Sequence, residues 1–176
     1  LMRQYEKING FGVMLVDAPN QMNRVEWNKY TKKPDIFYRL SQLDKKRLRR
    51  AAVKGVEIMF GTGAKEVMLP SEENIGPLNR PHFHYKKDAI YCDELQFLPH
   101  QTSITSAHCQ ATVSMGEDHE MGILNSRCES KEVKNLIVCD SSSFPDSCGA
   151  NPMVSIMTMA RYQGIRISAE LERYGL

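Results

Sequence analysis

The sequence has few of the features that mark the commonest small-protein functions. Its five cysteines are odd in number and form no C-x-x-C pair. A disulfide scaffold or a zinc knuckle is therefore not expected, and the thiols are predicted to be reduced. No apolar run approaches the roughly 20 residues that span a bilayer. The 23 basic and 21 acidic residues nearly cancel, which gives no basis for binding nucleic acid or an anionic membrane.

Three widespread catalytic and nucleotide-binding motifs are also missing. The chain has no G-x-S-x-G segment, which argues against a serine hydrolase. It has no G-x-x-x-x-G-K-[ST] loop for nucleoside triphosphates. It has no G-x-G-x-x-G turn either, so by itself it cannot hold a dinucleotide in the usual Rossmann manner.

The beginning of the chain has no signal-peptide pattern, and its first residue is Leu1 rather than Met. These features lead us to expect a cytoplasmic protein, of which this chain is a fragment or a processed form. Its 176 residues fit one domain, and 41% hydrophobic and 25% charged residues are typical of a globular protein.

Two helices are predicted from local patterns. One begins at Ser41 or Asp44 and reaches Phe60, with apolar residues at steps of three or four, and glycines follow it. The other begins at Asn151-Pro152, where asparagine can cap and proline suits the first turn. Its residues 153–160 are apolar on nearly all sides, which predicts burial. Shorter elements are expected as strands at 11–16, 24–30, 36–40, 66–69, 102–105 and 135–139, and as a helix at 88–98.

Residues 135–157 form a strand, a Ser/Pro/Gly loop and a helix start in succession, with Asp140 at the end of the strand. Free N–H groups and the positive end of the helix dipole favour negative charge at such a helix start. A reduced flavin carries negative charge of this kind. An ordinary packed crossover has the same pattern and is much commoner.

Histidines supply the other candidates. His108 can accept a proton from an alcohol, although a lone histidine is more often structural. His82 and His84 would share one face of a strand and could bind a metal ion. The sequence shows no third ligand for them, so no metal site is predicted.

Two segments resemble the glucose-methanol-choline (GMC) oxidoreductases. Residues 108–116, HCQATVSMG, resemble the family segment H-x-x-G-T-x-x-M-G. Residues 135–145, NLIVCDSSSFP, and the GANP at 149–152 resemble N-L-x-V-x-D-x-S-x-x-P followed by G-x-N-P. Their order and spacing agree with the family. Residues 38–44 and 63–67 resemble stretches of its substrate domain, so the resemblance extends over about residues 10–175.

The resemblance implies an FAD-dependent alcohol oxidase or dehydrogenase of the choline, cholesterol and long-chain alcohol oxidase-like branch. His108 is expected to be the catalytic base and Asn151 its hydrogen-bonding partner, with hydride transfer from the alcohol to flavin N5. The FAD is expected to contact four residues: Asp140, Ser141, Pro152 and Met153. The partners are the alcohol, an electron acceptor such as oxygen or a carrier, and a missing N-terminal Rossmann half.

The fold expected is α+β. Residues 1–115 would form part of a substrate-binding domain with an antiparallel sheet and helices. Residues 116–176 would return to the FAD-binding domain and complete its Rossmann-like sheet with a strand and the C-terminal helix. The family's Gly, Cys and Arg are replaced by Ala111, Val113 and Ser114. These replacements support the alternative of a degenerate or split module that is not catalytic and serves in binding or assembly.

Overall fold

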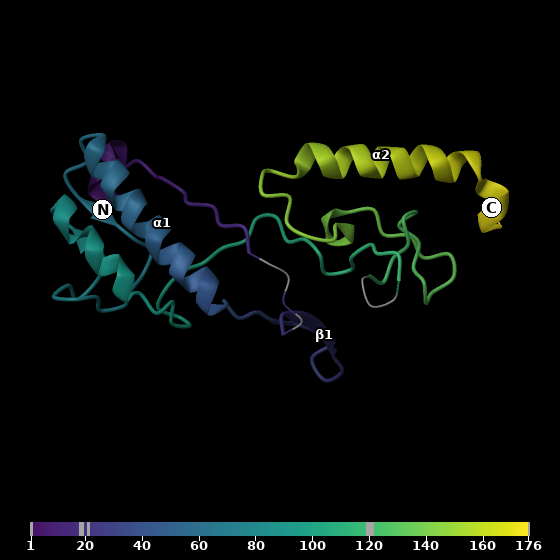
Figure 1. Cartoon of the computed structure of the whole chain (residues 1–176), viewed down its shortest axis with the longest axis horizontal. Helices are drawn as coiled ribbons and strands as arrows, with labels where there is room; N and C mark the ends of the chain where they lie inside the picture. The colour runs from purple at the N-terminus through teal and green to yellow at the C-terminus, as the bar shows by residue number, and fades with distance from the viewer. Residues whose placement is uncertain (1, 18–19, 21, 119–121, 176) are drawn as a thin grey trace. The chain divides into compact units, whose positions relative to one another are not determined.

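The computed structural model describes residues 2–17, 20, 22–118 and 122–175 (Figure 1). The chain divides into two compact units. Unit 1 comprises Leu1–Leu15 and Leu40–Thr105, and unit 2 comprises Val16–Arg39 and Ser106–Leu176. The expected division at residues 115 and 116 stays a prediction, because compactness does not show what each part binds.

Unit 1 is built around a helix pair. The long helix α1 (Gln42–Gly61) packs against the 3-10 helix η2 (Lys86–Glu94), and the two lie side by side in Figure 1. A small antiparallel pair, β3 (Val67–Met68) and β4 (His82–Phe83), completes the unit together with the 3-10 helix η1 (Met2–Lys7). The buried residues of this core are Val56, Val67, Ile75, Phe83, Ala89, Cys92 and Leu95.

Helix α1 confirms the prediction from its local sequence. Ser41 caps it in a reciprocal capping box with Asp44: the Asp44 N–H donates to Ser41 Oγ at 3.1 Å, and the Asp44 carboxylate accepts from the Ser41 N–H at 3.2 Å. The helix ends at Gly61 with Thr62 as its C-cap, and Gly63 follows with a left-handed φ of 94°. That conformation is one that glycine adopts without steric cost.

A buried carboxylate fixes the loop after η2. Glu73 is 3% exposed. It accepts hydrogen bonds from the Gln96 N–H at 2.6 Å, from the Leu98 N–H at 2.8 Å and from the Thr102 hydroxyl. Burial by itself would raise the pKa of Glu73, but these hydrogen bonds together hold the pKa below its usual value. Glu73 was not identified from the sequence as the residue that holds this stretch.

Unit 2 contains a β-hairpin and the C-terminal helices. Strands β1 (Arg24–Asn28) and β2 (Lys33–Phe37) pair antiparallel. Helix α2 (Met153–Ala169) follows the short 3-10 helix η3 (Ser141–Ser143) and precedes η4 (Leu171–Tyr174). Between the hairpin and these helices, residues 115–118 and 122–137 are held by isolated bridges rather than by strands. Two small antiparallel sheets with helices confirm the α+β class.

Several expected elements are wrong in place or type. Strand β2 begins three residues earlier than predicted and includes Pro34, which a two-stranded ribbon tolerates because an edge strand need not donate at every residue. The stretches 11–16, 102–105 and 135–139 form no strand. The last of these bridges only from Ile137 to Glu129, and one neighbouring segment is too little for a buried strand. The expected helix at 88–98 is the 3-10 helix η2.

The first turns of α2 were predicted to be buried, and this prediction is wrong. Met153, Val154 and Met157 are 57%, 68% and 56% exposed. In the described residues, only Pro152 and Gln163 of this stretch are buried. The apolar pattern was interpreted correctly as a helix, but no described segment of unit 2 covers that face. No helix in the described part of the chain is both long and apolar enough to cross a bilayer.

Candidate active site

The two motif segments singled out in the sequence are joined by backbone hydrogen bonds in unit 2. The Val113 N–H donates to the Ser142 carbonyl at 3.0 Å, and the Met115 N–H donates to the Ser143 carbonyl at 2.9 Å. The segment that follows His108 therefore runs along η3, although about 30 residues separate the two in the sequence. The sequence predicts the order and spacing of these two segments, and the structure shows that they are neighbours.

Side chains strengthen the same junction closer to His108. Ser141 Oγ donates to the Cys109 carbonyl at 2.9 Å. Gln110 Oε1 accepts from the Cys148 N–H at 3.0 Å. The two residues that follow His108 are thus tied to the loop that leads into α2.

Asp140 organises this loop from its beginning. Its carboxylate accepts from the Ser142 N–H at 2.8 Å and from the Ser142 hydroxyl, and it caps η3. Its carbonyl accepts from Ser143 Oγ at 2.7 Å, and Ser143 is fully buried. The aspartate therefore has a structural task in the described residues that is independent of any cofactor.

The Asn151 side chain accepts a hydrogen bond from the first turn of α2. Its side-chain oxygen accepts from the Met153 N–H at 3.1 Å, which satisfies one of the free donors of the first turn. The amide nitrogen of the same side chain is a donor. Pro152 is fully buried, and its carbonyl accepts from the Ile156 N–H at 2.9 Å. Proline here provides a rigid first turn.

His108 and Asn151 are both exposed. No hydrogen bond joins their side chains in the part of the chain that the structure describes. The His108 carbonyl accepts from Gln110 Nε2 at 3.4 Å. Their pairing, and the flavin contacts of Asp140, Ser141, Pro152 and Met153, stay predictions. What the structure establishes is that the segments carrying these residues are neighbours.

Ala111 stands where the family segment has glycine, and its backbone explains that preference. Its φ is 63°, in the left-handed region where a Cβ costs free energy. The substitution has therefore kept the glycine-like backbone conformation.

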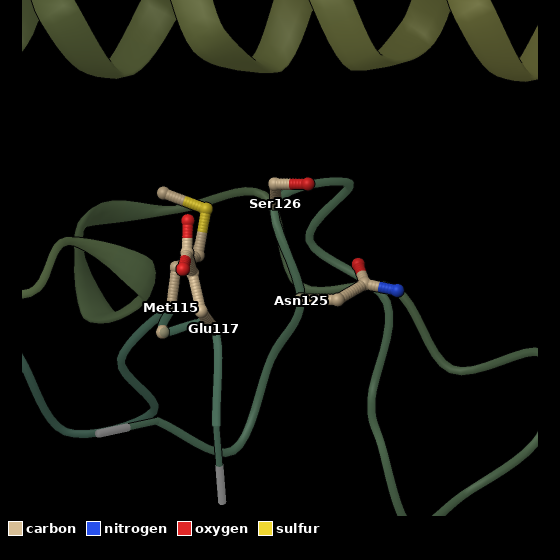
Figure 2. A pocket seen from close by; sticks show the side chains of 5 residues that line it. Met115, Glu117, Asn125 and Ser126 are labelled. Carbon is tan, nitrogen blue, oxygen red and sulfur yellow. The ribbon is translucent and has the colours of Figure 1, made fainter.

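A pocket of about 480 Å³ opens beside the end of the same segment (Figure 2). Its lining consists of Met115, Gly116, Glu117, Asn125 and Ser126. Neither His108 nor Asn151 is among these described residues. The pocket therefore does not mark the predicted catalytic pair.

The wall of this pocket is anchored by the half-buried carboxylate of Glu129, whose side chain is 15% exposed. It accepts from the Tyr174 hydroxyl at 2.7 Å and from Asn125 Nδ2 at 3.0 Å, and it pairs with Arg173 at 3.2 Å. Burial alone would raise the pKa of Glu129, but these hydrogen bonds and nearby arginines hold it at about 2. No local pattern in the sequence predicts this cluster, because its members come from segments about 45 residues apart.

A family model described as GMC oxidoreductase matches residues 19–160. The chain belongs to the GMC oxidoreductase family. That match includes both GMC segments whose backbones the structure joins.

Named relatives lie in one branch of the GMC family. Long-chain-alcohol oxidase FAO3 of Arabidopsis thaliana is 25% identical over 142 residues, which cover 77% of this chain and 19% of the relative. FAO4B of the same plant is 28% identical over 140 residues, with 72% and 18% covered. FAO1 is 27% identical over 152 residues, with 78% and 19% covered. The chain spans about a fifth of the length of these curated relatives. No solved structure matches it.

Proposed function

We propose that the protein to which this GMC chain belongs oxidises an alcohol to a carbonyl with FAD, and that this chain supplies the catalytic pair and one wall of the flavin pocket. The observation that supports the proposal best is the pair of backbone hydrogen bonds from Val113 and Met115 to η3. Through them, the segment bearing His108 is attached to the loop bearing Asn151.

The residues at the start of α2 fit a flavin. A helix of 17 residues presents its positive end there, and the exposed Asn151 and Met153 leave that end accessible. The Asp140-Ser141 step and the Pro152-Met153 step would hold the electron-rich side of the ring. When bound, FAD supplies the acceptor for the hydride of the alcohol.

The chain's own residues handle the proton. His108 accepts the hydroxyl proton of the alcohol, and the Asn151 amide nitrogen donates a hydrogen bond to the oxygen as negative charge develops. The cap contact at Met153 keeps the Asn151 oxygen turned toward the helix, so the nitrogen is the group left to face the substrate.

The proposed substrate is a long-chain alcohol, on the basis of the names of the relatives. Oxygen or another carrier would accept the electrons, and a flavin-binding N-terminal half of the same protein would complete the Rossmann-like sheet. Nothing in the chain supports nucleic acid as a partner, and the cytoplasm remains the proposed location.

The test is flavin reduction in the full-length protein. His108→Ala should slow reduction by a long-chain alcohol by about 10²–10⁴-fold, the usual contribution of a positioned general base, while the bound flavin spectrum persists. His100→Asn is the control, because His100 is exposed and lies in unit 1. Equal rates in the His108 variant and the control would reject the assignment.

A non-catalytic module is the second candidate, and the replacements at Ala111, Val113 and Ser114 are the reason to test for it. Co-expression with an N-terminal flavin-binding half separates the two. Bound flavin that an alcohol bleaches supports the enzyme, whereas a complex without flavin supports the module.

A further inference from the structure

Two histidines in unit 1 belong to neither GMC motif. His82 begins β4, Phe83 ends it, and His84 is the next residue. Phe83 is fully buried in the core. Because successive side chains in a strand point to opposite faces, the buried Phe83 directs both imidazoles to the outer face. His82 is half-buried and His84 is exposed.

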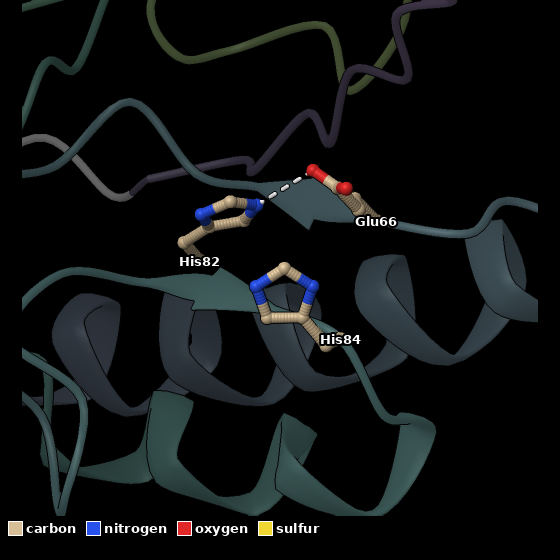
Figure 3. Close-up of side chains that lie close together, drawn as sticks. All are labelled: Glu66, His82 and His84. Atoms are coloured by element: carbon tan, nitrogen blue, oxygen red, sulfur yellow. Dashed lines mark hydrogen bonds and ion pairs between the residues drawn. The ribbon is translucent and has the colours of Figure 1, made fainter.

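The neighbouring strand brings a carboxylate to the same face. The register pairs Val67 with Phe83 and Met68 with His82. Continued by one residue, this register places Glu66 opposite His84. Figure 3 shows the three side chains directed into one space above the paired strands. The sequence could not reveal this third group, because it depends on which strand pairs with β4.

The three side chains are close enough to share an ion. His82 Nε2 lies 3.0 Å from Glu66 Oε2, and the two imidazole centroids are 4.4 Å apart. One ligand atom from each of the three residues lies within 4.8 Å of the others. Ligands at about 2.0–2.2 Å from zinc are separated by roughly 3.3 Å in a tetrahedron. The ligand atoms must therefore move closer together by side-chain rotation, and solvent exposure of Glu66 and His84 leaves room for that rotation.

We propose that Glu66, His82 and His84 bind a divalent transition-metal ion, with zinc as the ion that the ligand set fits best. Two imidazoles and one carboxylate disfavour magnesium and calcium, which take oxygen ligands. Three protein ligands leave a fourth tetrahedral position for water or an external ligand.

The surroundings suit entry of an ion. The side chains of His82 and Glu66 are 34% and 60% exposed, so solvent reaches the ligand atoms. The ion would take the place of the hydrogen bond between His82 Nε2 and Glu66 Oε2, since a metal ion binds the unprotonated ring nitrogen and the carboxylate. A surface His–Glu pair by itself contributes little to stability. A metal ion bound by the same side chains would contribute more.

The test uses the full-length protein after dialysis against a chelator. Titration calorimetry with Zn²⁺ should show one saturable site per chain, and Co²⁺ should give the intense visible absorption of a tetrahedral site. Glu66→Gln and His84→Ala should each weaken Zn²⁺ binding by more than about tenfold, because each removes one of three ligands.

Matched controls keep the proposal falsifiable. His100→Asn and Glu72→Gln remove an exposed histidine and an exposed glutamate of unit 1, and both should bind Zn²⁺ like the parent. Circular dichroism without metal should be the same for all variants. Zn²⁺ affinity that is equal in the parent and in the Glu66 and His84 variants would overturn the proposal, as would a lack of saturable uptake. Neither result bears on the alcohol oxidation proposed above.

Discussion

At residue 111 the backbone is left-handed, with φ of 63°, and the side chain is a methyl group. An L-residue with a Cβ pays about 1 kcal/mol or more in this region, whereas glycine does not. Ala111→Gly should therefore raise the free energy of unfolding by up to about 1 kcal/mol, less the extra chain entropy of glycine in the unfolded state.

Urea denaturation of the full-length protein measures this change. Ala107→Gly is the matched control: Ala107 is exposed, and its φ is not among the positive ones of the described residues. That control should be neutral or slightly destabilising. If both variants lose the same stability, the strain at Ala111 does not exist.

Glu129 makes the free energy of unfolding depend on pH in the acid range. Its pKa is about 2 in the folded chain, well below the ordinary 4.5. Because the folded pKa is depressed, the stabilisation is full above about pH 5 and is lost as pH falls toward 2. After allowance for solvent screening, the loss should be about 1–2 kcal/mol.

The comparison of Glu129→Gln with the parent checks this contribution. The variant should be less stable at pH 7, and the gap between the two should narrow as the pH is lowered from 5 toward 3. Glu132→Gln, at an exposed site, should follow the parent at every pH. A gap that is constant with pH would show that Glu129 contributes packing rather than charge.

At the scale of elements, the segments that could be predicted are those whose signals are local. Helix α1 carries its cap at Ser41, its apolar periodicity and its terminal glycines within one stretch of sequence, and its bounds followed from them. The segment 135–139 depends instead on neighbouring strands. Its apolar composition predicted a strand, but pairing through Ile137 alone does not form one.

A close approach of two segments offers an element-scale test at Gly122. A Cβ built there would lie 2.4 Å from the Gly116 backbone nitrogen and 2.5 Å from the Ser114 carbonyl oxygen. Backbone atoms cannot move aside as a flexible side chain can. Gly122→Ala should therefore push residue 122 away from residues 114–116 and destabilise unit 2 by about 1–3 kcal/mol.

Thermal unfolding and hydrogen exchange of the Leu124 N–H, which donates to the Ser114 carbonyl at 3.1 Å, measure that effect. Gly164→Ala is the control, since a Cβ at Gly164 meets nothing within 4 Å and alanine favours the helix. That control should be neutral or stabilising. Unchanged exchange at Leu124 in Gly122→Ala would contradict the close approach.

At the scale of the whole molecule, family membership and the α+β class could be predicted, whereas the burial of α2 could not. Burial depends on what lies over a face, and the apolar residues Met153, Val154 and Met157 are exposed in unit 2.

The candidate site shows the same limit. His108, Asp140 and Asn151 could be chosen from sequence because each sits in a motif with characteristic spacing. Glu66 and the partners of Glu129 could not, because strand register and long-range contacts decide who their neighbours are.

The hydrogen bonds from Val113 and Met115 to η3 use only main-chain atoms. Main-chain hydrogen bonds of this kind do not depend on which side chain each residue carries. Side chains of the GMC segment can therefore differ from the family pattern, as they do at Val113 and Ser114, without loss of the hydrogen bonds that hold the backbone after His108. Departures from a family signature at these two positions are accordingly poor evidence that an ancestral activity has been lost.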